Sequence, residues 1–188
     1  MPDPGFLQYN TPMKRLVLGI GQSLRGDDAA GLEAVRLWQH LYPQTAQKVQ
    51  VELCELPGLA LLDLLEGIQA AVLVDALQTA AQAGTLQRLG PDELAAFTLD
   101  SQSAHGWGVA ETLALGHSLY PELAKCRISL IGIAGKTFHM GAGLSSEVQA
   151  GLLQAASMIE KEIQGLMDPG RLPPENKKRK PLRPPLSS

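Results

Sequence analysis

The sequence predicts an α/β fold in which helices cover both faces of a mostly parallel sheet. Strand-like apolar runs alternate along the chain with segments whose apolar residues recur at helical spacing. Three of the strand-like runs, at residues 14–20, 70–77 and 127–134, have no polar face, which is typical of strands buried on both sides. With 188 residues, 45% of them hydrophobic, the chain can bury one core of ordinary domain size.

The expected elements follow in order along the sequence. Strands are predicted at 14–20 (KRLVLGI), 49–54 (VQVELC), 70–77 (AAVLVDAL), 85–89 (TLQRL) and 127–134 (RISLIGIA). The 85–89 run is shorter and more polar than the others, so we expect it at an edge of the sheet. Helices are predicted at 31–41, 57–65, 106–119 and 144–166, the last capped by Ser145 or Ser146.

Composition divides the chain into a lead-in at 1–12, a single domain at 13–168 and a tail at 169–188. The tail holds six of the 13 prolines and a net charge of +5, which indicates an unpacked extension. The rest of the chain then carries −8, which disfavours a nucleic-acid partner. No apolar run is long enough for a membrane span, and no secretory signal or disulfide framework is apparent, so we expect a cytoplasmic protein.

The first strand leads into GIGQSLRGDDAAG, residues 19–31, where two glycines form a tight turn. A dinucleotide-binding loop would need a third glycine, but Leu24 stands there, and the adjacent carboxylates of Asp27 and Asp28 would repel a pyrophosphate. One of these two acids is expected to cap the following helix. The other is then free to face the crevice at the carboxyl ends of the strands.

Two further residues could share that crevice. Asp75 ends an apolar strand, where a carboxylate must be paired, hydrated or bound to a metal, although bonding to loop amides would serve as well. His105 stands in a glycine-rich turn before a helix, and it follows the element after Asp75. Two carboxylates and an imidazole would make an open site for zinc or nickel, while a structural role for each residue remains the alternative.

Four blocks of this sequence resemble the NiFe-hydrogenase maturation endopeptidases. GIGQSLRGDDAAG is similar to the family segment G-x-G-N-x-L-x-x-D-(D/E)-x-x-G, and VLVDAL, SAHGWGVAETL and GIAG followed by LSSEV match the other blocks in order. The resemblance covers about residues 14–164. Gln22 replaces the usual Asn, and Ala29 stands where many members have Gly; neither change removes a metal-contacting residue.

The resemblance implies a three-layer α/β/α fold whose five-stranded, mostly parallel sheet has one antiparallel strand. It implies an enzyme that removes the C-terminal peptide of a hydrogenase large-subunit precursor after nickel insertion. Asp28, Asp75 and His105 would contact nickel supplied by the substrate, with no permanently bound metal, and the enzyme would be a monomer. Asp27 is then expected to face the helix start or solvent, and residues 135–143 to form a mobile rim.

Two readings from other functional classes remain open. A nickel-binding assembly factor would use the same ligands without proteolysis. A peptidyl-tRNA hydrolase-like enzyme could share the scaffold, but the acidic domain lacks the basic groove that tRNA requires.

Overall fold

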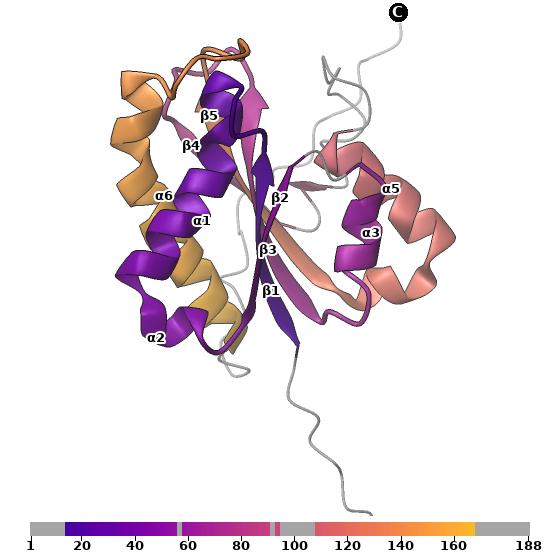
Figure 1. Cartoon of the computed structure of the whole chain (residues 1–188). Coiled ribbons are helices and arrows are strands. Elements are labelled where there is room, and N and C mark those ends of the chain that lie inside the picture. Colours follow the sequence, from indigo (N-terminus) through magenta and orange to yellow (C-terminus); the bar gives the residue numbers. More distant parts are fainter. Residues whose placement is uncertain (1–13, 56–57, 91–92, 95–107, 168–188) are drawn as a thin grey trace, which may run out of the picture.

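The computed structural model describes residues 14–55, 58–90, 93–94 and 108–167, and Figure 1 shows its three layers. The predicted lead-in at 1–12, the tail at 169–188 and the site residue His105 lie outside the described residues. Within the described ranges, no helix is both long and apolar enough to cross a bilayer.

One five-stranded sheet forms the middle layer. In spatial order its strands are β2 (Gln50–Glu55), β1 (Arg15–Gly21), β3 (Ala70–Gln78), β5 (Arg127–Gly135) and β4 (Leu86–Leu89). The first four are mutually parallel, and β4 pairs antiparallel with β5. The structure therefore confirms the predicted fold class, the three apolar strands as interior neighbours, and the short polar strand as an edge.

Helices cover both faces of the sheet, as the absence of polar strand faces requires. On one side lie α1 (Ala30–Leu41), the short α2 (Pro43–Ala46) and α6 (Ser146–Met167), and on the other α3 (Ala60–Leu64) and α5 (Val109–Leu119) (Figure 1). The short α2 and two 3₁₀ turns, η1 (Gly26–Ala29) and η2 (Pro121–Lys125), were not predicted, because four or five residues carry no periodic signal.

The sheet separates two hydrophobic cores. Along β1 the side chains of Leu16, Leu18 and Ile20 enter the core beneath α3 and α5, whereas Val17 enters the core beneath α1 and α6. Every one of these residues is buried, so neither face of the strand can be polar. The two free cysteines belong to the first core, with Cys126 buried in it and Cys54 packed against it.

A buried polar contact joins the helices that cover the second core. The indole Nε1 of Trp38, which is fully buried on α1, donates a hydrogen bond of 2.9 Å to Oε2 of Glu160 on α6. The hydroxyl of Thr45 on α2 donates 2.7 Å to the other oxygen of the same carboxylate. Glu160 thus satisfies two donors at once and fixes α6 against α1 and α2.

Gly31 brings α1 against the two central strands. A Cβ at this position would lie 2.3 Å from the backbone oxygens of both Ile20 on β1 and Val74 on β3. Only glycine permits this approach, which holds the first turn of α1 over the carboxyl end of β1.

We expect Gly31→Ala to lower the free energy of unfolding by about 2–3 kcal/mol, because the methyl group would push α1 away from the sheet. Gly165→Ala is the matched control on α6, where a Cβ meets nothing within 4 Å. That variant should keep or slightly raise stability, since Ala is the better helix former. Urea unfolding of both variants measures the difference, and equal stability would contradict the close approach.

Candidate functional site

Asp75 lies where one neighbour of β3 ends its pairing. The β1–β3 ladder stops at the pair Gly19–Val74, whereas β3 continues beside β5 as far as Gln78. Asp75 therefore lies inside the strand, within the predicted range 70–77, although the sequence had suggested that the acid ends the apolar run. It is nevertheless the first residue of β3 beyond the last pair with β1, at the edge of the sheet where α/β proteins place ligands.

The negative charge of the Asp75 carboxylate is poorly stabilised by its surroundings. Its Oδ1 accepts a hydrogen bond of 2.8 Å from the backbone N–H of the next residue, Ala76. Burial raises the pKa of Asp75 to about 7; this amide opposes the rise, and the negative charge of Asp28 adds to it. The predicted alternative was bonding to loop amides, but the amide of Ala76 belongs to β3 itself, and its bond does not offset the burial.

Asp28 belongs to η1, which connects β1 to α1. The turn into η1 depends on Gly21, whose φ is +149° and whose Cβ would lie 1.8 Å from the backbone oxygen of Asp28. The Asp28 side chain is partly buried, and its charge acts on Asp75. The structure therefore brings these two predicted site residues, 47 positions apart in sequence, into one electrostatic environment.

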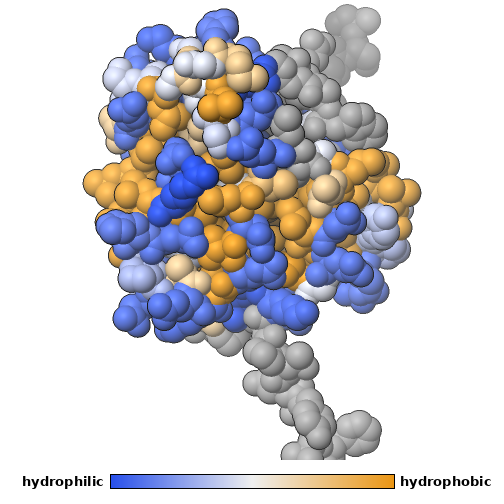
Figure 2. Space-filling model, viewed as in Figure 1, coloured by the Kyte–Doolittle hydropathy of each residue, from blue (hydrophilic) through white to orange (hydrophobic). Residues whose placement is uncertain are grey.

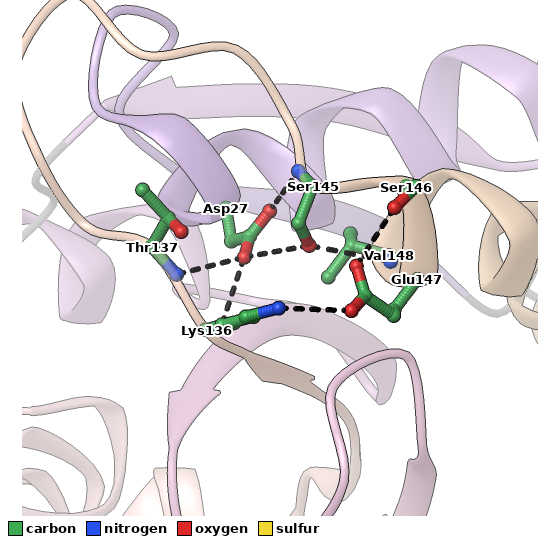
Figure 3. A network of polar contacts seen from close by, with 7 residues as sticks. All are labelled: Asp27, Lys136, Thr137, Ser145, Ser146, Glu147 and Val148. Atoms are coloured by element: carbon green, nitrogen blue, oxygen red, sulfur yellow. Dashed lines mark hydrogen bonds and ion pairs between the residues drawn. The ribbon is translucent and has the colours of Figure 1, made fainter.

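Asp27 faces neither the start of α1, the helix that follows it, nor solvent, so that prediction is wrong. The residue is fully buried, and its carboxylate accepts hydrogen bonds from the loop after β5 and from the start of α6 (Figure 3). The amides of Lys136 and Thr137 donate to Oδ2 at 2.8 and 2.9 Å. The amide of Ser145 donates to Oδ1 at 2.6 Å, and its hydroxyl donates to Oδ2 at 2.9 Å.

These donors outweigh the cost of burying the charge. Burial alone would raise the pKa of Asp27, but the amides of Ser145, Lys136 and Thr137, helped by the Ser145 hydroxyl, lower it overall. The prediction that one of the two acids is the N-cap of α1 is wrong. The residue at that position is Ala29, which provides no side-chain bond. The donors that make Asp27 a structural residue lie more than 100 positions away, so no local pattern could have revealed them.

The loop at 136–145 is anchored to the β1–α1 connection through main-chain bonds as well. The amide of Asp27 donates to the Thr137 oxygen at 2.7 Å, and that of Gly26 donates to the Ala142 oxygen at 3.1 Å. Gly26 has a φ of +61°, and a Cβ there would lie 2.4 Å from the Thr137 oxygen. The structure thus shows a loop held by hydrogen bonds at several positions, where the sequence had suggested a mobile rim.

The same loop leads into a capped helix. The hydroxyl of Ser145 accepts from the amide of Val148 at 3.5 Å, so Ser145 is the N-cap of α6, one of the two predicted candidates. Lys136 Nζ lies 3.0 Å from Oε1 of Glu147 in the first turn. The hydrogen bond from Lys136 is the main reason that the pKa of Glu147 falls to about 2.

A complete three-ligand metal site is not visible within residues 14–55, 58–90, 93–94 and 108–167. No group of three or more His, Cys, Asp and Glu side chains that could hold a metal occurs there. The predicted third ligand, His105, lies outside these ranges, so its meeting with Asp28 and Asp75 stays a prediction.

We expect Asp27→Asn to destabilise the fold by about 2–4 kcal/mol at pH 7, because an amide nitrogen would face buried donors in place of a carboxylate oxygen. Asp63→Asn, which changes an exposed carboxyl on α3, is the matched control. The pKa of Asp27 is lowered in the fold, so its contribution is present above the unfolded value near 4 and is lost as the pH falls further. Urea unfolding at pH 7 checks the effect, and a loss no larger than that of Asp63→Asn would contradict it.

Asp75 should show the opposite behaviour. Its folded pKa of about 7 lies above the unfolded value, so ionisation costs stability as the pH rises from about 4 to 7. We expect Asp75→Asn to remove this cost, which we place at about 2 kcal/mol because the residue is partly exposed. The melting temperature of the variant should exceed that of the wild type by ~4–8 °C at pH 8, and by clearly less at pH 5. A difference independent of pH would show that the carboxyl is not desolvated.

Solved structures with the same fold come from hydrogenase maturation enzymes. The maturation protease HybD of Thermococcus kodakarensis is 29% identical, with a TM-score of 0.62, and the match covers 80% of this chain and 99% of that one. The hydrogenase maturating endopeptidase HybD of Escherichia coli is 22% identical, with a TM-score of 0.67 over 82% of this chain and 94% of that one, which supports the fold alone.

Sequence comparison identifies the family. The family model described as hydrogenase maturation protease matches residues 35–162, a range that includes Asp75 and begins after Asp28. A Methanocaldococcus jannaschii protein assigned as a hydrogenase maturation protease is 31% identical over 153 residues, covering 79% of this chain and 95% of that protein. The chain therefore belongs to the hydrogenase maturation protease family.

Proposed function

We propose that this chain is the endopeptidase that removes the C-terminal peptide from a NiFe-hydrogenase large-subunit precursor after nickel has been inserted. The observation that carries the proposal is the pair of Asp28 and Asp75 at the carboxyl edge of the sheet, in a chain of the hydrogenase maturation protease family. A buried carboxyl whose pKa is raised further by a neighbouring carboxylate would gain from a cation bound at both groups.

The nickel would arrive as part of the substrate. Asp28 and Asp75 supply oxygen ligands, and His105 would supply an imidazole nitrogen, which together suit a divalent ion of this kind. A ligand must be deprotonated to bind, so a carboxyl with a pKa of about 7 releases its proton when the ion arrives. Binding of the nickel-bearing precursor would thereby offset the cost of ionising Asp75.

The proposed reaction is hydrolysis of one peptide bond. Water adds to the scissile carbonyl, the C–N bond breaks, and the products are a new carboxylate on the mature subunit and an amine on the released peptide. The substrate's nickel, held by Asp28, Asp75 and His105, would polarise the scissile carbonyl or a water, or one of the two carboxylates would act as the base toward water. The loop at 136–145 donates hydrogen bonds to Asp27, and these bonds keep the neighbouring residue Asp28 in position.

The test is a processing assay with a nickel-loaded precursor of the hydrogenase from the same organism, followed by gel mobility and intact mass. We expect Asp28→Asn, Asp75→Asn and His105→Ala each to lower the cleavage rate by at least about 100-fold, because each removes a ligand of the ion. Asp63→Asn should cleave at the wild-type rate. Circular dichroism confirms that the variants are folded.

Three outcomes would contradict parts of the proposal. Wild-type rates in Asp28→Asn and Asp75→Asn would remove these residues from the site. Cleavage of a nickel-free precursor at the same rate would show that nickel is not the recognition mark. A stable complex with the precursor whose mass never changes would indicate an assembly factor instead of a protease.

A further inference from the structure

The two most exposed large hydrophobic side chains in the described part of the chain lie in adjacent segments. Leu24 is 70% exposed in the β1–α1 connection, and Met140 is 72% exposed in the loop after β5. The segments that carry them border the edge of the sheet where Asp28 and Asp75 lie. Figure 2 shows apolar surface among polar residues at this end of the molecule.

Hydrogen bonds to main-chain oxygens hold the two segments side by side. The amide of Gly141 donates to the backbone oxygen of Leu24 at 2.7 Å, and Nε of Arg25 donates to the oxygen of Phe138 at 3.1 Å. Together with the bonds of Gly26 and Asp27 to the same loop, these contacts fix the backbone beneath both side chains. A surface ordered in advance costs little entropy when a partner binds.

The loop partly buries one of its hydrophobic residues and leaves the other in solvent. The ring of Phe138 lies against Gly135, where a Cβ would approach it to 2.5 Å, so this side chain contributes to packing. Met140, two residues later, remains exposed. Exposed Leu and Met side chains on an ordered base have no role in holding the fold, but they suit an apolar contact with a macromolecule.

We infer that Leu24 and Met140 form an apolar contact surface that binds the large-subunit precursor beside its cleavage site. This inference rests on the proposed function, and its basis is position: Leu24 stands four residues before Asp28 in the same connection. A protein substrate that reaches Asp28 must cover this surface, because a stable protein interface buries roughly 800 Å² of each partner. The occupant is therefore the folded precursor, through apolar side chains near its scissile bond.

The experiment measures cleavage kinetics on the nickel-loaded precursor for Leu24→Ser, Met140→Ser and the double variant. We expect each single change to raise KM about tenfold and the double change about 100-fold, with kcat within threefold of wild type. Melting temperatures should stay within about 2 °C, because neither side chain is buried. Leu153→Ser is the matched control, since Leu153 is 61% exposed on α6, away from the two tied segments, and its KM should not change.

Each other outcome overturns the inference in a recognisable way. If the wild type cleaves the precursor and the double variant has an unchanged KM, the contact surface is wrong while the proposed function stands. A fall in kcat at constant KM would place the residues in the chemistry rather than in docking. A wild-type dimer that the double variant dissociates, seen by sedimentation, would make the occupant a second copy of the chain. Failure of the wild type to cleave would remove the proposed function itself, and this inference with it.

Discussion

The structure at the carboxyl edge of the sheet depends on one buried carboxylate. Asp27 accepts three amide bonds and one hydroxyl bond from residues that follow β5, so a single side chain joins the β1–α1 connection to the 136–145 loop and to the start of α6. In a buried setting, each of these bonds is costly to lose. The position of Asp28, the next residue, follows from this arrangement.

The two acids Asp27 and Asp75 near this edge therefore have opposite energetic characters. Asp27 is satisfied by donors, and its pKa is lowered, so it remains ionised in the fold. Burial raises the pKa of Asp75 to about 7, the charge of Asp28 adds to the rise, and the one amide bond from Ala76 opposes it. A buried carboxyl with a raised pKa beside a second carboxyl is the arrangement that the proposed nickel-bearing substrate would relieve.

Glycines allow the backbone to form this edge. Gly31 lets α1 approach β1 and β3, Gly21 lets the chain turn past the backbone of Asp28, and Gly26 lets the two functional segments approach each other. In each case a Cβ would lie within 2.4 Å of a backbone oxygen. The contacts of Gly21 and Gly31 give a physical reason for glycine at two positions of the segment that resembles the family motif.

The sequence by itself determined the strands, the main helices and the edge position of the polar strand, because buried strands without a polar face and helical periodicity are local signals. The family followed from the resemblance of four sequence blocks to its motifs. It also indicated that acids after the first strand and in the third lie toward one edge. Only the tertiary structure decided which of Asp27 and Asp28 is structural, because the donors that bind Asp27 come from residues 109–118 positions away. It likewise decided that the pairing of β3 with β1 ends just before Asp75, since where β1 and β3 separate depends on how α1 and η1 pack against the sheet rather than on the composition of β3.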